Sequence, residues 1–66
     1  MTNLKLNPDI IGKEFPADYS GTKFKIVDEN EDYIYVVIIR DGIDGPKMPM
    51  SKNAVYRHAK LFGVTL

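Results

Sequence analysis

Residues 33–40 read Tyr-Ile-Tyr-Val-Val-Ile-Ile-Arg, and this stretch decides the fold. From Tyr33 to Ile39 every side chain is β-branched or aromatic, which is the composition typical of β-strands. The run is far shorter than the roughly 20 apolar residues that a membrane-spanning helix needs. It therefore predicts a strand that is apolar on both of its faces.

The residues on the N-terminal side of this strand predict its partner. Residues 22–28 alternate, with Phe24 and Ile26 on one face and mostly polar side chains on the other. Such a period of two is typical of a half-buried strand. Residues 29–32 form a polar connection, so we expect an antiparallel hairpin of residues 22–28 and 33–40.

The chain after residue 40 is rich in turn residues. Asp41-Gly42 and Asp44-Gly45-Pro46 predict a turn, because Asp, Gly and Pro each favour turn conformations. Residues 47–50 are then expected to add a short edge strand.

Residues 52–62 predict one amphipathic helix. Ser51 precedes it as an N-cap, and Gly63 follows it in the left-handed position that ends many helices. Apolar residues recur at i, i+4 and i+7, a spacing that places them on one face toward a core. That face consists of Val55, Ala59 and Phe62, joined by His58 and Leu61.

The N-terminal residues allow two interpretations. Asn7-Pro8-Asp9 is typical of a helix start, with Asn as the cap and Pro at the first helical position. Gly12 and Pro16 limit such a helix to one turn. The alternative is a short strand over residues 10–15, and the sequence does not distinguish the two.

Together these elements predict a single α+β domain over residues 1–66. It would consist of a small antiparallel sheet of three to four strands and one C-terminal helix. The strand 33–39 then needs cover on both faces, and the helix covers one. The other would be covered by the N-terminal segment, by barrel-like closure or by a second subunit; the N-terminal apolar residues are Leu4, Leu6, Ile10, Ile11 and Phe15.

The composition limits what can stabilise the chain. It contains no cysteine, and His58 is its one histidine, so disulfides and a Cys/His zinc site are excluded. A chain of this size buries only about 60% of its unfolded surface, which leaves good packing or self-association. The missing cysteines favour a cytoplasmic location, and no apolar run near the N-terminus resembles a signal peptide or a membrane anchor.

Charge is distributed unevenly along the neutral chain. Residues 1–46 contain nine acidic and five basic residues, whereas residues 47–66 contain four basic residues and no acid. This asymmetry suggests an acidic partner for the basic end. The alternative is internal pairing, in which the basic end packs beside the chain's own acidic loop.

The acidic loop resembles a calcium-binding loop only in part. Residues 28–32 read Asp-Glu-Asn-Glu-Asp and match its first, third and fifth positions. The sixth position requires Gly and is Tyr33, and the twelfth requires a bidentate Glu and is Ile39. We interpret the loop as a turn and expect neither a metal nor a cofactor.

Few residues are suited to catalysis. Ser20, Ser51 and His58 are the main candidates, but Ser51 is expected to cap the helix and His58 to be packed and hydrogen-bonded on its apolar side. No nucleophile–base pair is evident, so we expect a binding module without enzymatic activity.

The opposite face of the helix is the candidate binding site. Lys52, Tyr56 and Lys60 follow one another at i, i+4 and i+8, with Arg57 alongside, and all are expected to face solvent. Cations can follow a phosphate backbone and a tyrosine can stack on a base, which favours association with nucleic acid. The alternative function is a protein-interaction module, an inhibitor or a homodimer, that uses the apolar strand surface or the acidic hairpin tip. The face is also compatible with ordinary solvation.

Overall fold

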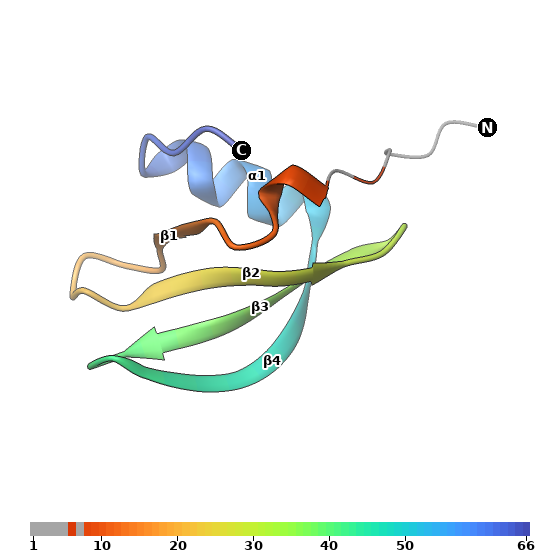
Figure 1. The fold of residues 1–66 in the computed structure, drawn as a ribbon. Coiled ribbons are helices and arrows are strands. Elements are labelled where there is room, and N and C mark those ends of the chain that lie inside the picture. The colour runs from red at the N-terminus through yellow and green to blue at the C-terminus, as the bar shows by residue number, and fades with distance from the viewer. Residues whose placement is uncertain (1–5, 7) are drawn as a thin grey trace.

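The computed structural model describes residue 6 and residues 8–66. Over these residues it shows a four-stranded antiparallel sheet in the order β1-β2-β3-β4, followed by one C-terminal helix (Figure 1). The small α+β fold expected from the sequence is therefore confirmed. The elements are the 3-10 helix η1 (Pro8–Ile10), β1 (Glu14–Pro16), β2 (Lys23–Glu29), β3 (Tyr33–Arg40), β4 (Ile43–Ser51) and α1 (Lys52–Leu61).

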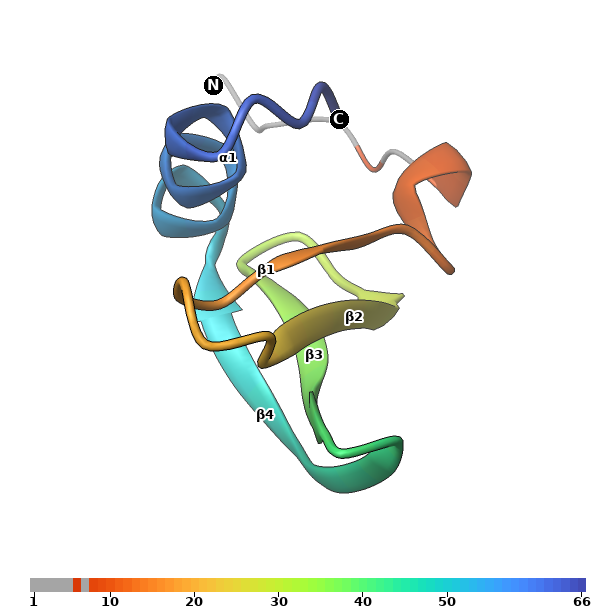
Figure 2. The same ribbon diagram turned by 90° about the vertical axis from the view of Figure 1, so that its left-hand side faces the viewer.

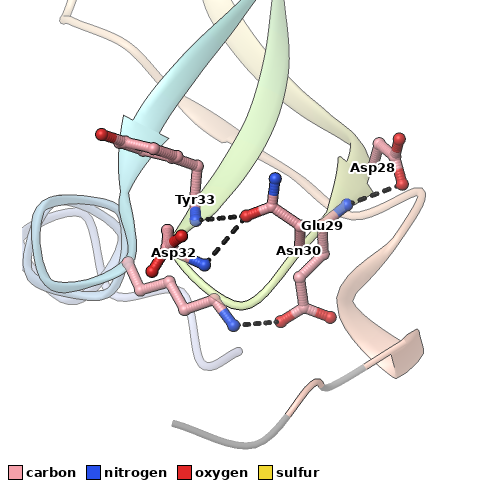
Figure 3. Close-up of polar contacts among 6 residues, drawn as sticks. Asp28, Glu29, Asn30, Asp32 and Tyr33 are labelled. Atoms are coloured by element: carbon pink, nitrogen blue, oxygen red, sulfur yellow. Dashed lines mark hydrogen bonds and ion pairs between the residues drawn. The ribbon is translucent and has the colours of Figure 1, made fainter. Parts of the chain in front are cut away.

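The central hairpin forms as predicted. β2 and β3 pair antiparallel, with Phe24 opposite Ile38 and Ile26 opposite Val36. The register then shifts, because Asp28 lies opposite Tyr35 and one residue of β2 is left over as a bulge. At the tip, the Asn30 side chain accepts hydrogen bonds from the backbone N–H groups of Asp32 and Tyr33, which stabilises the turn (Figure 3).

β4 is longer than the expected edge strand, because the turn before it is shorter than residues 41–46. Asp41 and Gly42 have φ values of 54° and 75°, so both adopt the left-handed conformation. Two consecutive left-handed residues form the tight hairpin turn whose twist matches that of the flanking strands. The strand therefore resumes at Ile43.

The residues 44–46, which were expected in a turn, form a bulge within β4. Val37 lies opposite Lys47 and Ile39 opposite Asp44, so the register shifts by one residue between these pairs. A Cβ atom at Gly45 would lie only 3.1 Å from the carbonyl oxygen of Ile38. Glycine thus permits the two strands to approach closely at the bulge.

The N-terminal segment contains a helical turn and a strand, but the strand covers residues 14–16 instead of the expected 10–15. η1 is a single turn, and β1 follows it and pairs antiparallel with β2, with Phe15 opposite Phe24. The Gly12 N–H donates to the Ile26 carbonyl at 2.7 Å, which holds the connection between η1 and β1 against β2. The expected cap residue, Asn7, lies outside the described residues.

The core lies on one face of the sheet, beneath α1. Figure 2 shows α1 and β1 on the same side of β2 and β3. The residues that are at most 1% exposed come from η1, three strands and the helix; they are Ile10, Phe15, Ile26, Ile34, Val36, Val55 and Ala59.

This arrangement argues against one of the three ways in which the second face of β3 was expected to be covered. Ile10 and Phe15 pack into the same core as α1, so the N-terminal segment does not cover the second face of β3 with these residues. Leu6 and Ile11 are exposed, and Leu4 lies outside the described residues. Among the described elements, the second face of β3 therefore has no covering layer.

Among the helices of residues 6 and 8–66, none has the length and apolar character needed to cross a bilayer.

Candidate partner-binding face of α1

α1 begins at its predicted cap. Ser51 has an extended backbone, and its Oγ accepts a hydrogen bond from the Ala54 N–H at 3.2 Å. This bond satisfies one of the N–H groups that the first helical turn leaves without a partner.

The helix also ends as predicted. Gly63 has a φ of 75°, the Gly63 N–H donates to the Lys60 carbonyl at 3.0 Å, and the Val64 N–H donates to the Ala59 carbonyl at 2.9 Å. These two bonds define a Schellman motif. Both ends of the helix are therefore determined by local interactions, and the rotation of the helix against the sheet decides which side chains reach solvent.

Lys52 does not belong to the exposed face, contrary to the sequence prediction. Its side chain is 3% exposed, and its Nζ lies 3.3 Å from the carboxylate of Glu29, whose side chain is 2% exposed. Side chains four positions apart differ by about 40° around a helix, so a stripe at i, i+4 and i+8 turns steadily. The start of this stripe faces the core. The pair also supports the interpretation that the basic end packs beside the chain's own acidic loop.

Tyr56 is half-buried and packs against the core. With Lys60 it lines a shallow hollow of about 350 Å³, which is completed by Val64, Thr65 and Leu66. Because its ring is partly covered, Tyr56 offers a smaller surface for stacking than the sequence predicted.

Arg57 and Lys60 are exposed, as predicted. Leu61 lies beside them and is 74% exposed, although the sequence pattern assigned it to the core. Leu61 follows Val55 by six positions and therefore lies about 120° from it around the helix, too far to reach the sheet. We call Asn53, Arg57, Lys60 and Leu61 the outer face of α1.

A small groove separates this outer face from β4. It has a volume of about 250 Å³ and is lined by Met50 of β4 and by Ala54, Arg57, His58 and Leu61 of α1. The lining is mainly apolar, and Arg57 is its one formally charged residue. Such a groove can receive a small apolar side chain beside the guanidinium group.

His58 has a structural environment, which confirms the packed, hydrogen-bonded role expected from the sequence. Its Nε2 lies 3.0 Å from the Pro16 carbonyl oxygen, and its ring contacts those of Phe15, Phe24 and Phe62 at centroid distances of 5.7, 5.6 and 5.1 Å. It connects α1 to β1.

The acidic tip does not assemble a metal site among the described residues. Asp28 accepts a hydrogen bond from the Glu29 N–H (Figure 3), and the Glu29 carboxylate pairs with the Nζ of Lys52. No group of three or more His, Asp or Glu side chains in residues 6 and 8–66 is arranged to hold a metal ion.

A larger hollow of about 580 Å³ lies at the other end of the sheet, between the β1–β2 loop and the β3–β4 turn. Its charges are mixed, since Lys23, Lys25 and Arg40 line it together with Glu14, Asp41 and Asp44. In the neighbouring loop, hydrogen bonds from the Ser20 hydroxyl and backbone N–H lower the pKa of Asp18 below its usual value. Because both signs of charge line the hollow, it favours neither an anionic nor a cationic ligand.

Neither the family models, nor the curated proteins, nor the solved structures compared with this chain match it.

Proposed function

We propose that the protein is a non-enzymatic binding module that docks on an acidic, partly apolar protein surface through the outer face of α1. The observation that supports this proposal is the exposure of Leu61, at 74%, next to two cations on a helix without acidic residues. From residue 45 to residue 66 the chain contains no Asp or Glu. A partner with acidic groups around an apolar contact would therefore meet no like charge on this helix.

The arrangement has the features of a small interface centre. Arg57 and Leu61 lie four positions apart, so they are neighbours on the helix surface. An exposed apolar side chain supplies contact area, and arginine is enriched at interface hot spots. The groove between α1 and β4 lies directly beside both residues and can accept a side chain of the partner.

Binding to nucleic acid is less well supported than the sequence suggested. The burial of Lys52 leaves Arg57 and Lys60 as the exposed cations of the predicted site. Two phosphate contacts correspond to a slope of only about −2 in a plot of log affinity against log salt. The protein-interaction function uses the same cations and also accounts for the exposed leucine.

Site-specific photocrosslinking in intact cells tests the proposal. A photoreactive residue in place of Asn53 lies on the outer face without replacing Leu61 or either cation. We expect crosslinks to an acidic protein, and we expect Leu61→Ser or Arg57→Glu to reduce their yield roughly tenfold or more, as for a hot-spot residue. Glu31→Ser, an exposed change at the hairpin tip, is the matched control and should leave the yield unchanged.

A second measurement separates the two functions. Gel shifts with single-stranded and duplex DNA and RNA at low salt should show no binding that depends on Arg57 and Lys60. A shift that Arg57→Glu/Lys60→Glu abolishes and Leu61→Ser leaves intact would favour nucleic acid. A crosslink yield that does not change in the Leu61→Ser variant would contradict the proposed function.

A further inference from the structure

The face of the sheet opposite α1 exposes a continuous apolar stripe along β3. Ile34 and Val36 point into the core and are fully buried. Because side chains alternate along a strand, the residues between them point to the other face. Tyr33 is 46% exposed and the rest are half-buried; the stripe consists of Tyr33, Tyr35, Val37 and Ile39.

Charged side chains flank this stripe on the neighbouring strands. On β2, Lys25 lies opposite Val37 and Asp28 opposite Tyr35. On β4, Lys47 lies opposite Val37, and its Nζ is 5.4 Å from the centre of the Tyr35 ring. Paired residues on antiparallel strands share a face, so these charges surround the stripe.

The face as a whole is neutral, which argues against a polyanion as its ligand. Three cations and three acids are assigned to it by the strand register. They are Lys23, Lys25 and Lys47 against Glu14, Asp28 and Asp44. A surface of this kind, with an apolar centre and both signs of charge around it, is suited to a copy of itself.

Pairing of two copies through their sheet edges is disfavoured. β4 is one edge of the sheet and contains Pro46 and Pro49, which lack the N–H groups that an added strand would need. β1, the other edge, is three residues long and ends at Pro16. Contact between the sheet faces leaves these edges unused.

Two orientations bring one face onto another by a two-fold axis. If the strands run parallel, β2 of one copy lies over β4 of the other, and Lys25 meets Lys47. If the strands run antiparallel about an axis level with Val36, each strand lies over its own equivalent. Lys25 then meets Asp28 of the second copy, and Val37 meets Tyr35. The antiparallel orientation pairs opposite charges, and it places an aromatic ring against an aliphatic side chain.

We propose that two copies of the chain pack face to face through the stripe along β3, with antiparallel strands, as a homodimer. Face-to-face sheets lie about 10 Å apart and cross at about 30°, so the central pairs make the closest contacts. Packing of this type gives a short chain the second apolar layer that the elements of residues 6 and 8–66 do not supply. It leaves α1, on the far side of each sheet, free to bind a partner.

Sedimentation and size-exclusion chromatography with light scattering, over micromolar to millimolar concentrations, give the first test. We expect a reversible dimer. Val37→Asp should weaken dimerisation by at least about a hundredfold, because two charges would enter the centre of the interface. Lys60→Glu, on α1, should leave the dimer unchanged. A monomer at millimolar concentration, or a dimer unaffected by Val37→Asp, would overturn the proposal.

A charge-swap pair tests the orientation without altering the core. Lys25→Glu places a second carboxylate against Asp28 in both halves of its homodimer, and Asp28→Lys places a second ammonium group against Lys25. Each variant alone should therefore dimerise at least about tenfold more weakly. A mixture of the two should restore dimerisation, since both contacts of the heterodimer then join opposite charges. Circular dichroism of each variant controls for folding. A mixture that stays as weak as the separate variants would overturn the antiparallel arrangement.

Discussion

The ion pair of Lys52 and Glu29 joins the start of α1 to the tip of the β2–β3 hairpin. The Lys52 Nζ and the Glu29 Oε2 lie 3.3 Å apart, and both side chains are almost fully buried. Charges removed from water require compensation by a partner, and the Glu29 carboxylate provides it for the Lys52 ammonium group. Lys52 is therefore a structural residue, and the proposed binding face of α1 does not include it.

Lys52→Met should destabilise the fold strongly, because it breaks the buried ion pair with Glu29. We expect a loss of about 3–5 kcal/mol in the free energy of unfolding. Lys60→Met is the matched control on the same helix, and because Lys60 is exposed its effect should stay within about 0.5 kcal/mol. Urea unfolding followed by circular dichroism measures both, and equal effects would show that Lys52 is solvated.

The ends of α1 depend on residues that lie next to it in the chain. Ser51 satisfies an N–H group of the first turn, and Gly63 provides the left-handed residue that closes the last one. These contacts set the length of the helix. They do not set its rotation, which follows from the packing of Val55 and Ala59 on the sheet.

Gly63→Ala should reduce stability by about 1–2 kcal/mol, because an L-residue is strained in the left-handed conformation. Apart from the adjacent residues, no atom lies within 4 Å of the position that the new Cβ would occupy, so backbone strain is the expected cause. Gly63→Asn should cost less, since Asn tolerates this conformation better. Thermal unfolding measures the stability of both variants. Equal losses of stability would contradict backbone strain as the cause.

The domain closes its core with a segment from each end of the chain. Ile10 of η1 and Phe15 of β1 are buried against Val55 and Ala59 of α1, on the inner face of the sheet. The face of the sheet that bears the stripe along β3 and the outer face of α1 consequently lie on opposite sides of the molecule. A homodimer formed through the sheets would therefore present two copies of the outer face of α1. It could bind a partner that has two docking sites with increased avidity.

Two adjacent isoleucines test this closure. Ile10 is 1% exposed and Ile11 is 44% exposed. Ile10→Ala should cost about 2–5 kcal/mol, as expected for a large side chain removed from a core, whereas Ile11→Ala should cost less than about 1 kcal/mol. Chemical denaturation of both variants compares the same substitution one residue apart. Similar losses would show that η1 does not pack as described.

Much of the local structure could be predicted from the sequence. The hairpin of residues 22–28 and 33–40, the cap at Ser51 and the end of α1 at Gly63 all follow from side-chain alternation or from contacts between near neighbours. The placement of Arg57 and Lys60 on an exposed surface was predictable for the same reason. Periodicity and capping act over a few residues, so the sequence alone determined these features.

The tertiary structure decided which side chains of α1 are available to a partner. The sequence pattern assigned Lys52 to solvent and Leu61 to the core, and the structure reverses both. The rotation of α1 depends on how it packs against strands distant in the chain, and the Glu29 carboxylate stabilises Lys52 in a position that a lone lysine avoids. The length of β4 was decided in the same way, by pairing with β3 across a bulge. These outcomes depend on contacts between residues far apart in sequence, which local patterns do not encode.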